Sequence, residues 1–165
     1  MKRAAPSRDE LLAILDEVKD PEVPVLSVVE LGIVRDVSVS DGRVIVTITP
    51  TYSGCPAMHA METDVVATLS RHGVPNARVK TVYAPAWTTD WISDEAKAKL
   101  AAYGIAPPSR VGSDDLVPLR RRAPVECPYC HSVNTIVRSE FGSTACKAIL
   151  FCNGCHQPFE LFKPI

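Results

Sequence analysis

Residues 34–49 read VRDVSVSDGRVIVTIT, two β-branched runs that are separated by Asp41-Gly42. An Asp-Gly pair between two such runs is the strongest short-range signal for a β-hairpin. We therefore predict strands over residues 34–40 and 43–49, joined by a tight turn. The other elements of the first domain are expected on either side of this hairpin.

Helices are predicted both before and after the hairpin. Ser7 and Glu10 form a capping box, and apolar residues at helical spacing then predict a helix that runs to about Lys19. Pro56 suits the first turn of a second helix, which closes at His72-Gly73. The apolar face of this second helix is defined by residues that recur at helical spacing: Met58, Met61, Val65 and Leu69.

The remaining elements define the expected architecture. Alternation over residues 77–83 predicts a third strand, and a last helix begins at Ser93 and stops at Gly104. We expect an α/β fold, with a small mixed or antiparallel sheet covered by helices, followed by a C-terminal antiparallel zinc ribbon. The proline-rich range 105–124 is expected as a linker, so the predicted domains are residues 1–104 and 125–165.

The tail contains two CxxC knuckles, Cys127-Pro128-Tyr129-Cys130 and Cys152-Asn153-Gly154-Cys155. Twenty-one residues separate them, close to the spacing expected of a four-thiolate zinc site, and strands near 135–137 and 148–151 would bring them together. We predict one structural Zn²⁺ on Cys127, Cys130, Cys152 and Cys155. A redox pair or two disulfides is the alternative. For His131 and His156, which follow the knuckles, a turn role is favoured over ligation.

Cys55 lies just before Pro56, where the free amides of a helix start are expected to lower the pKa of a thiol. Such a thiolate is a nucleophile or a metal ligand, whereas an inert thiol at a capped helix start is the alternative. His59 is four residues after Cys55. By helical spacing it could reach the Cys55 thiolate or the same ion, and a surface histidine is the alternative. Cys146 is a fifth tail cysteine without a place in the zinc site, and spacing alone favours a small buried apolar residue there.

Charge and composition exclude several classes of protein. Eighteen basic and nineteen acidic residues give a net charge of −1, too balanced for a protein that coats nucleic acid. The one basic run, Arg120-Arg121-Arg122, has no interleaved aromatic residues, so no nucleic-acid partner is expected. No apolar signal segment opens the chain, and no stretch suits a membrane helix. A cytoplasmic protein is therefore predicted.

Several segments resemble known families. DPEVPV (20–25), LGIVRDV (31–37) and TPTYSGCPA (49–57) together resemble the small SufT-like domain of iron–sulfur cluster assembly proteins. TDWIS (89–93), YGIAPP (103–108), the two knuckles and FGST (141–144) resemble more narrowly the D-subunit family of the bacterial phenylacetyl-CoA epoxidase system. The resemblance covers nearly the whole chain.

This resemblance implies a non-catalytic accessory protein in aerobic phenylacetate degradation. Residues 1–104 would be a SufT-like metal-assembly domain that matures or maintains the iron–sulfur or di-iron centres of its partners, the oxygenase and reductase subunits of the epoxidase. Cys55 matches the family's motif cysteine, the four knuckle cysteines match its zinc site, and Cys146 matches a tail cysteine. A maturation factor must release what it binds, so we predict that Cys55, with Cys146, is a ligand of a transient iron or iron–sulfur cluster. A role of His59 rests on spacing alone, and a homodimer would supply two copies of Cys55.

Two other functions stay open. Cys55 could serve as the nucleophile of an enzyme that acts on a CoA thioester, with His59 as the only local general base. A nucleic-acid-binding zinc ribbon would depend on the basic run at residues 120–122.

Overall fold

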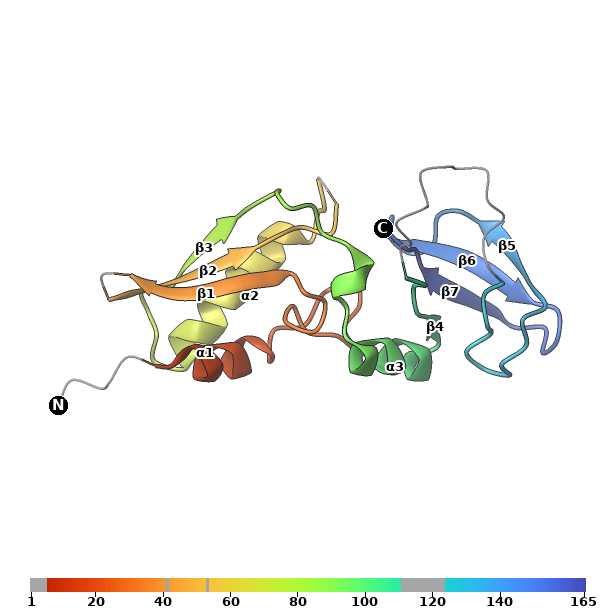
Figure 1. Cartoon of the computed structure of the whole chain (residues 1–165), viewed down its shortest axis with the longest axis horizontal. Helices are drawn as coiled ribbons and strands as arrows, with labels where there is room; N and C mark the ends of the chain where they lie inside the picture. The colour runs from red at the N-terminus through yellow and green to blue at the C-terminus, as the bar shows by residue number, and fades with distance from the viewer. Residues whose placement is uncertain (1–5, 41, 53, 111–123) are drawn as a thin grey trace. The chain divides into compact units, whose positions relative to one another are not determined.

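The computed structural model describes residues 6–40, 42–52, 54–110 and 124–165. The chain forms two compact units, Met1–Trp87 and Thr88–Ile165, each with its own sheet (Figure 1). Among the described residues, every helix is too short or too polar to cross a bilayer.

The predicted hairpin is the centre of the first unit. Strand β1 (Val34–Ser40) pairs antiparallel with β2 (Arg43–Ile48), and Gly42 adopts a φ of 72°, as the tight turn requires. Strand β3 (Arg78–Thr81) pairs in parallel with β2, which gives a mixed sheet in the order β1-β2-β3. The predicted mixed α/β fold is confirmed for this unit.

Two helices pack beside each other against this sheet (Figure 1). Helix α1 (Arg8–Leu15) begins at the predicted capping box, and α2 (Met58–Arg71) connects β2 to β3. Alternate residues of β2 are buried, so the strand presents one apolar face to the helices. The resulting core includes Leu11, Leu15, Val44, Val46, Ile48, Met61, Val65 and Leu69.

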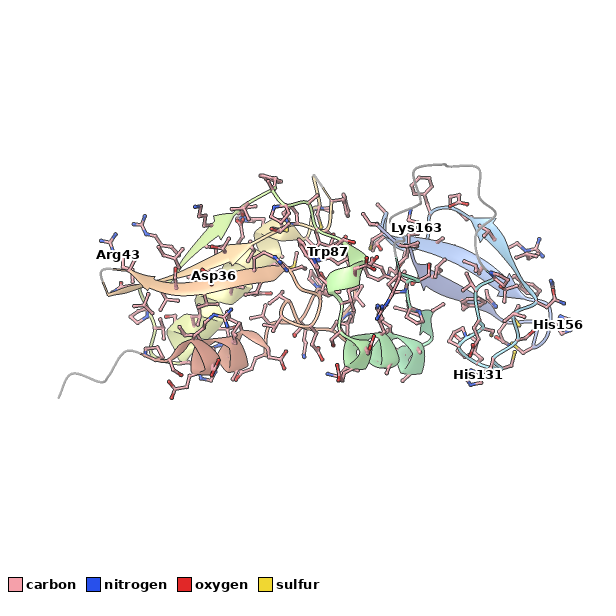
Figure 2. The ribbon with its side chains drawn as sticks, viewed as in Figure 1. Asp36, Arg43, Trp87, His131, His156 and Lys163 are labelled. Carbon is pink, nitrogen blue, oxygen red and sulfur yellow. The ribbon has the colours of Figure 1, made fainter. Side chains whose placement is uncertain are left out.

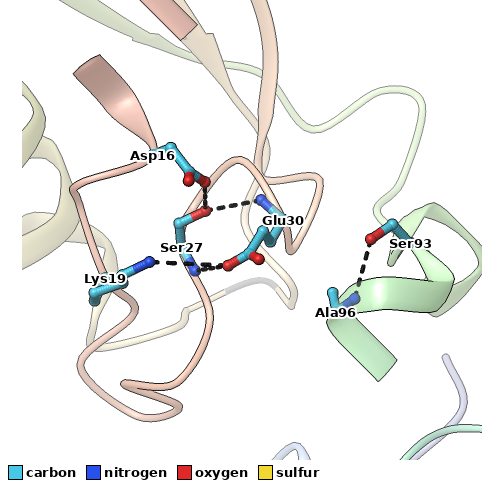
Figure 3. A network of polar contacts seen from close by, with 6 residues as sticks. All are labelled: Asp16, Lys19, Ser27, Glu30, Ser93 and Ala96. Atoms are coloured by element: carbon cyan, nitrogen blue, oxygen red, sulfur yellow. Dashed lines mark hydrogen bonds and ion pairs between the residues drawn. The ribbon is translucent and has the colours of Figure 1, made fainter. Parts of the chain in front are cut away.

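Helix α1 ends at Leu15 rather than at the predicted Lys19, because the following residues bond to the next loop. The Val28 amide donates to the Val18 carbonyl at 3.0 Å, and Lys19 forms a β-bridge with Ser27. Figure 3 shows the polar network of this loop. The Ser27 hydroxyl donates to Asp16 and accepts from the Glu30 amide at 3.0 Å, while the Glu30 carboxylate accepts from the Ser27 amide at 2.9 Å.

The described residues of the second unit form a four-stranded sheet, one 3₁₀ helix and one α-helix. A short 3₁₀ helix (Thr89–Trp91) precedes α3 (Asp94–Tyr103), which begins at the predicted N-cap Ser93 (Figure 3) and ends at Gly104. The four-stranded sheet has the order β4-β7-β6-β5. Its strands are β4 (Ile105–Ala106), β5 (Thr135–Ser139), β6 (Lys147–Cys152) and β7 (Pro158–Phe162).

The boundary between the units differs from the boundary expected at residue 104. Helix α3 and the start of the expected linker belong to the second unit, because β4 pairs in parallel with β7. The Thr88 hydroxyl and the Thr89 amide also donate to the Ile165 carbonyl, at 2.7 and 3.0 Å. Residues 111–123 of the expected linker, with the basic run at 120–122, lie outside the described residues.

A buried ion pair connects the two central strands of the ribbon sheet. The Lys147 side chain is 5% exposed, and its Nζ lies 3.2 Å from Glu160 Oε2. The other carboxylate oxygen of Glu160 accepts from the Ser143 amide at 2.8 Å. Burial raises the pKa of Glu160, but the hydrogen bonds from Ser143 and the charge of Lys147 outweigh burial, so the net pKa lies below 4.5.

Replacing Glu160 by Gln should destabilise this unit by about 2 to 3 kcal/mol, because it removes the carboxylate charge that pairs with the buried Lys147 ammonium. Urea titration of the full chain measures the loss. The folded pKa of Glu160 is lowered, so its contribution is present above its ordinary pKa of 4.5 and is lost as the pH falls through the folded value. The difference between wild type and variant should therefore shrink in acid. A Lys147→Met, Glu160→Gln double variant should recover most of the stability; a double variant as unstable as Glu160→Gln would contradict the role of the pair.

Candidate metal centres

The two knuckles meet at one end of the ribbon sheet. Antiparallel pairing of β5 with β6 places Thr135 opposite Cys152, as the predicted strands require, and the Asn153 amide donates to the Asn134 carbonyl at 2.9 Å. The Sγ atoms of Cys127 and Cys155 are 3.7 Å apart, and those of Cys130 and Cys152 are 3.5 Å apart. All four sulfurs lie within 4.8 Å of one another.

These distances fit a tetrahedral metal site. Zinc–thiolate bonds of about 2.3 Å place tetrahedral sulfurs about 3.8 Å apart. A disulfide bond is about 2.05 Å long, and all six cysteines are free thiols. The alternative of two disulfides is therefore absent from the structure. Cys127 and Cys152 also belong to the buried core of the sheet, with Ala148, Leu150 and Phe159 among their neighbours.

Backbone amides and burial shift the pKa values of two of these thiols in opposite directions. Amides of Cys155 and Gly154 donate toward Cys152 and lower the pKa of its thiol to about 6. Burial, together with the adjacent sulfurs, raises the pKa of Cys155 to about 12. Four sulfurs at this separation repel one another when they are all ionised, and a divalent cation among them removes that repulsion.

His131 and His156 occupy the turn positions expected for them. Their φ angles are 62° and 61°, and both lie at the knuckle end of the second unit (Figure 2). His131 Nδ1 lies 2.6 Å from Glu126 Oε1. Neither histidine is among the four residues that converge on one point in the described part of the chain.

The first knuckle also packs on the end of α3. Gly104 has a φ of 92°, and a Cβ there would lie 2.9 Å from the Tyr129 hydroxyl oxygen. The knuckle is thus held against the helix cap within the same unit. Neither the helix periodicity nor the CxxC spacing contains a signal for this contact.

A matched pair of glycine variants tests this packing. Gly104→Ala and Gly42→Ala both strain a left-handed backbone, at about 1 to 2 kcal/mol, but nothing lies within 4 Å of a Cβ at Gly42. We expect Gly104→Ala to destabilise its unit more than Gly42→Ala does, and to slow zinc uptake after chelation. Thermal unfolding and metal reconstitution measure both effects. Equal losses in the two variants would show that Tyr129 does not press on the cap.

Cys55 lies in the loop between β2 and α2. Helix α2 begins at Met58 with Ala57 as its N-cap, so Cys55 lies two residues before the cap and Pro56 belongs to a preceding turn. The Cys55 amide donates to the Tyr52 carbonyl, and its carbonyl accepts from the Met58 amide, each at 3.3 Å. The residue is 8% exposed.

The prediction that the helix start lowers the pKa of Cys55 is wrong. Burial raises the pKa of the thiol, and the charges of Glu22 and Asp20 raise it further. The Ala57 amide and the Tyr52 side chain act in the opposite direction but are outweighed. At neutral pH the Cys55 thiol is therefore protonated until a cation or another group displaces the proton.

The loop that begins at Asp20 brings acidic groups to Cys55. Asp20 is buried, and its Oδ1 accepts from the Glu22 and Val23 amides at 2.7 and 2.8 Å. From the sequence, solvated loop charges are the default for Asp20 and Glu22, and proximity to Cys55 after packing is the alternative; in the structure both charges raise the pKa of the thiol. The sequence does not single out Thr49, whose buried hydroxyl has no hydrogen-bond partner among the described residues.

The other two candidate ligands have different surroundings. His59 is exposed on the first turn of α2, and its carbonyl accepts from the Thr63 hydroxyl at 2.8 Å. Cys146 is buried, as the apolar alternative expected, and its Sγ lies 3.0 Å from the Thr144 hydroxyl. The geometry leaves ligation by either residue as a prediction.

Comparison with known proteins agrees with this two-part organisation. Residues 8–84 match the family described as iron–sulfur cluster assembly protein, and residues 113–163 match the PaaD zinc beta ribbon domain. The chain is 41% identical, over 98% of its length and 96% of the relative, to the D subunit of the 1,2-phenylacetyl-CoA epoxidase of Escherichia coli (strain K12). The chain belongs to this D-subunit family.

Further relatives match a part of the chain. An Fe–S protein maturation auxiliary factor of Porphyromonas gingivalis is 35% identical over 57% of this chain and 90% of the relative. Two solved structures share the fold. A DUF59 domain from Bacillus anthracis has a TM-score of 0.53 at 33% identity over 56% of this chain and 90% of that chain. A conserved hypothetical protein from Thermotoga maritima has a TM-score of 0.51 at 30% identity, over 61% and 98%.

Proposed function

We propose that this chain is a non-catalytic accessory protein of the phenylacetyl-CoA epoxidase system, in the cytoplasm, and that it matures or maintains the iron–sulfur or di-iron centres of the oxygenase and reductase subunits. Its family membership and its maturation-factor relatives support an accessory role in iron–sulfur assembly. The observation that carries the proposal is the place of Cys55, a buried thiol in the loop before α2, within the range that matches the assembly family.

In this proposal the ribbon binds one structural zinc ion. Cys127, Cys130, Cys152 and Cys155 are assigned as its ligands because their sulfurs fit a tetrahedral shell. A closed four-thiolate shell has no open position for a substrate, so its contribution is to the stability of the second unit.

Cys55 is assigned to a separate, labile site. In the described residues of the first unit, no three His, Cys, Asp or Glu side chains converge closely enough to hold an ion. In this proposal Cys55 therefore supplies one ligand of an incomplete set. A protein that hands on iron or a cluster must release it, and an incomplete shell favours release. Cys146, His59, a second copy of the chain or the client would complete the shell.

The structure disfavours the thioester-cleaving alternative. A nucleophilic cysteine needs a lowered pKa or an adjacent base, whereas the pKa of Cys55 is raised. The groups that act most strongly on the thiol are the Ala57 amide, Glu22, Tyr52 and Asp20, and His59 is not among them.

Reconstitution of the epoxidase with and without this chain tests the proposal. Oxygenase and reductase subunits are produced in cells that contain or lack the gene, purified anaerobically, and compared for iron per subunit and for epoxidation of phenylacetyl-CoA. We expect lower iron content and lower activity without the chain. Full metal content and activity in its absence would contradict the proposal.

A further inference from the structure

Strand β5 differs from every other sheet edge that the structure describes. The edges of the first sheet contain charged residues, Arg35 and Asp36 on β1 and Arg78 and Lys80 on β3, which oppose pairing with another strand. Strand β4 has only two residues, both buried. Strand β5 is longer than β4 and contains a single charged residue, Arg138, next to the exposed apolar pair Ile136 and Val137.

Apolar side chains are exposed on and beside β5. Ile136 and Val137 are 39% and 42% exposed within the strand, and Val133 and Phe141, at its two ends, are 61% and 68% exposed. Among the described residues, β5 has a strand partner only on its β6 side. The described part of the chain therefore leaves one edge of β5 open, with exposed apolar side chains in the strand and at both of its ends, and an open edge of this kind accepts an added strand.

Two cationic side chains, Arg138 and Lys163, lie near these apolar residues. Arg138 lies in the strand, with its guanidinium carbon 5.1 Å from the centre of the Phe151 ring. Lys163 Nζ lies 4.7 Å from the centre of the Phe141 ring (Figure 2). Glu140 is the one exposed acid between Val133 and Phe141, so two cationic side chains accompany one acidic side chain beside β5. The edge therefore complements a segment that has apolar and acidic side chains.

We propose that β5 is the docking edge for an extended, acidic–apolar segment of an epoxidase subunit, which adds to the sheet as a strand beside β5. The inference rests on the proposed function for the identity of the partner. Main-chain hydrogen bonds to β5 would provide affinity, and contacts to Ile136, Val137 and Phe141 would provide specificity. Arg138 and Lys163 would select carboxylates in the partner.

The test uses the full zinc-loaded chain and the purified oxygenase and reductase subunits as probes. An Ile136→Lys, Val137→Lys double variant should weaken binding to one of these subunits by about tenfold or more. Val39→Lys, at an exposed apolar residue of β1, is the matched control and should bind normally. Hydrogen exchange of the wild-type chain should slow over residues 135–139 when the subunit is bound. Normal zinc content and circular dichroism show that the double variant folds.

Four results would overturn the proposal: unchanged affinity of the double variant, equal loss in the Val39→Lys control, no binding of the wild-type chain to either subunit, or protection at β5 caused by self-association of this chain. Thr68→Ala, at a buried position of the first unit outside the proposed labile site, should bind the subunit normally. A docking-edge variant that loses binding, while Cys55→Ala still supports a fully metallated epoxidase, would retain the docking edge and reject the proposed function.

Discussion

Cys55→Ala is expected to abolish the contribution of this chain to epoxidation while leaving its fold intact. The substitution removes one buried sulfur from a loop, which costs about 1 to 2 kcal/mol of stability. The four knuckle cysteines that we assign to zinc remain unchanged in this variant. Cells that contain the variant should show phenylacetyl-CoA epoxidation close to that of cells lacking the gene. Turnover by the purified epoxidase measures the effect.

Two variants separate a ligand role of Cys55 from a packing role. Cys55→Val keeps an apolar side chain of similar size at this buried position but removes the sulfur, so it should be as inactive as Cys55→Ala. Thr68→Ala, at another buried position of the same unit, should cost stability and keep activity. An active Cys55→Val variant would show that the residue acts only through packing.

The second large effect is expected in the ribbon. Structural zinc in small modules contributes on the order of 10 to 16 kcal/mol, so a Cys127→Ser, Cys152→Ser double variant should lose its zinc and unfold the second unit. Metal analysis after gel filtration and limited proteolysis measure the loss. Both cysteines are core residues of the sheet as well as candidate ligands, which adds to the expected destabilisation.

The first unit provides the internal control for this experiment. Its core contains none of the four knuckle cysteines, so residues 8–84 should stay resistant to protease in the double variant. Retention of one zinc per chain by the double variant would refute the assignment of the site.

Local signals predicted most of the secondary structure. The hairpin turn at Gly42, the Ser7–Glu10 capping box and the helix that begins after Ser93 and ends at Gly104 all have their cause within a few residues, and the structure contains each of them. The zinc ribbon was predictable for the same reason, because each CxxC knuckle is a local turn whose sulfurs serve one ion.

Contacts between residues far apart in the sequence account for the features that the sequence did not predict. The two-residue strand β4 exists because β7, more than fifty positions later, pairs with it, and periodicity contains no record of such a partner. For Cys55, the local sequence indicates the amides of a helix start but not the burial and the two carboxylates that the loop at Asp20 brings to the thiol. The direction in which the pKa of Cys55 shifts could therefore be determined only from the tertiary structure.

A role of this chain in metal-centre assembly depends most directly on whether Cys55 affects the metal content of the epoxidase. The decisive measurement is iron and acid-labile sulfide per oxygenase and reductase subunit, after anaerobic purification from cells that carry wild-type protein or Cys55→Ala. We predict a clear deficit in one subunit with Cys55→Ala, at unchanged zinc content of the accessory chain. Equal iron and sulfide in both preparations, with epoxidase activity at the wild-type rate, would contradict that role.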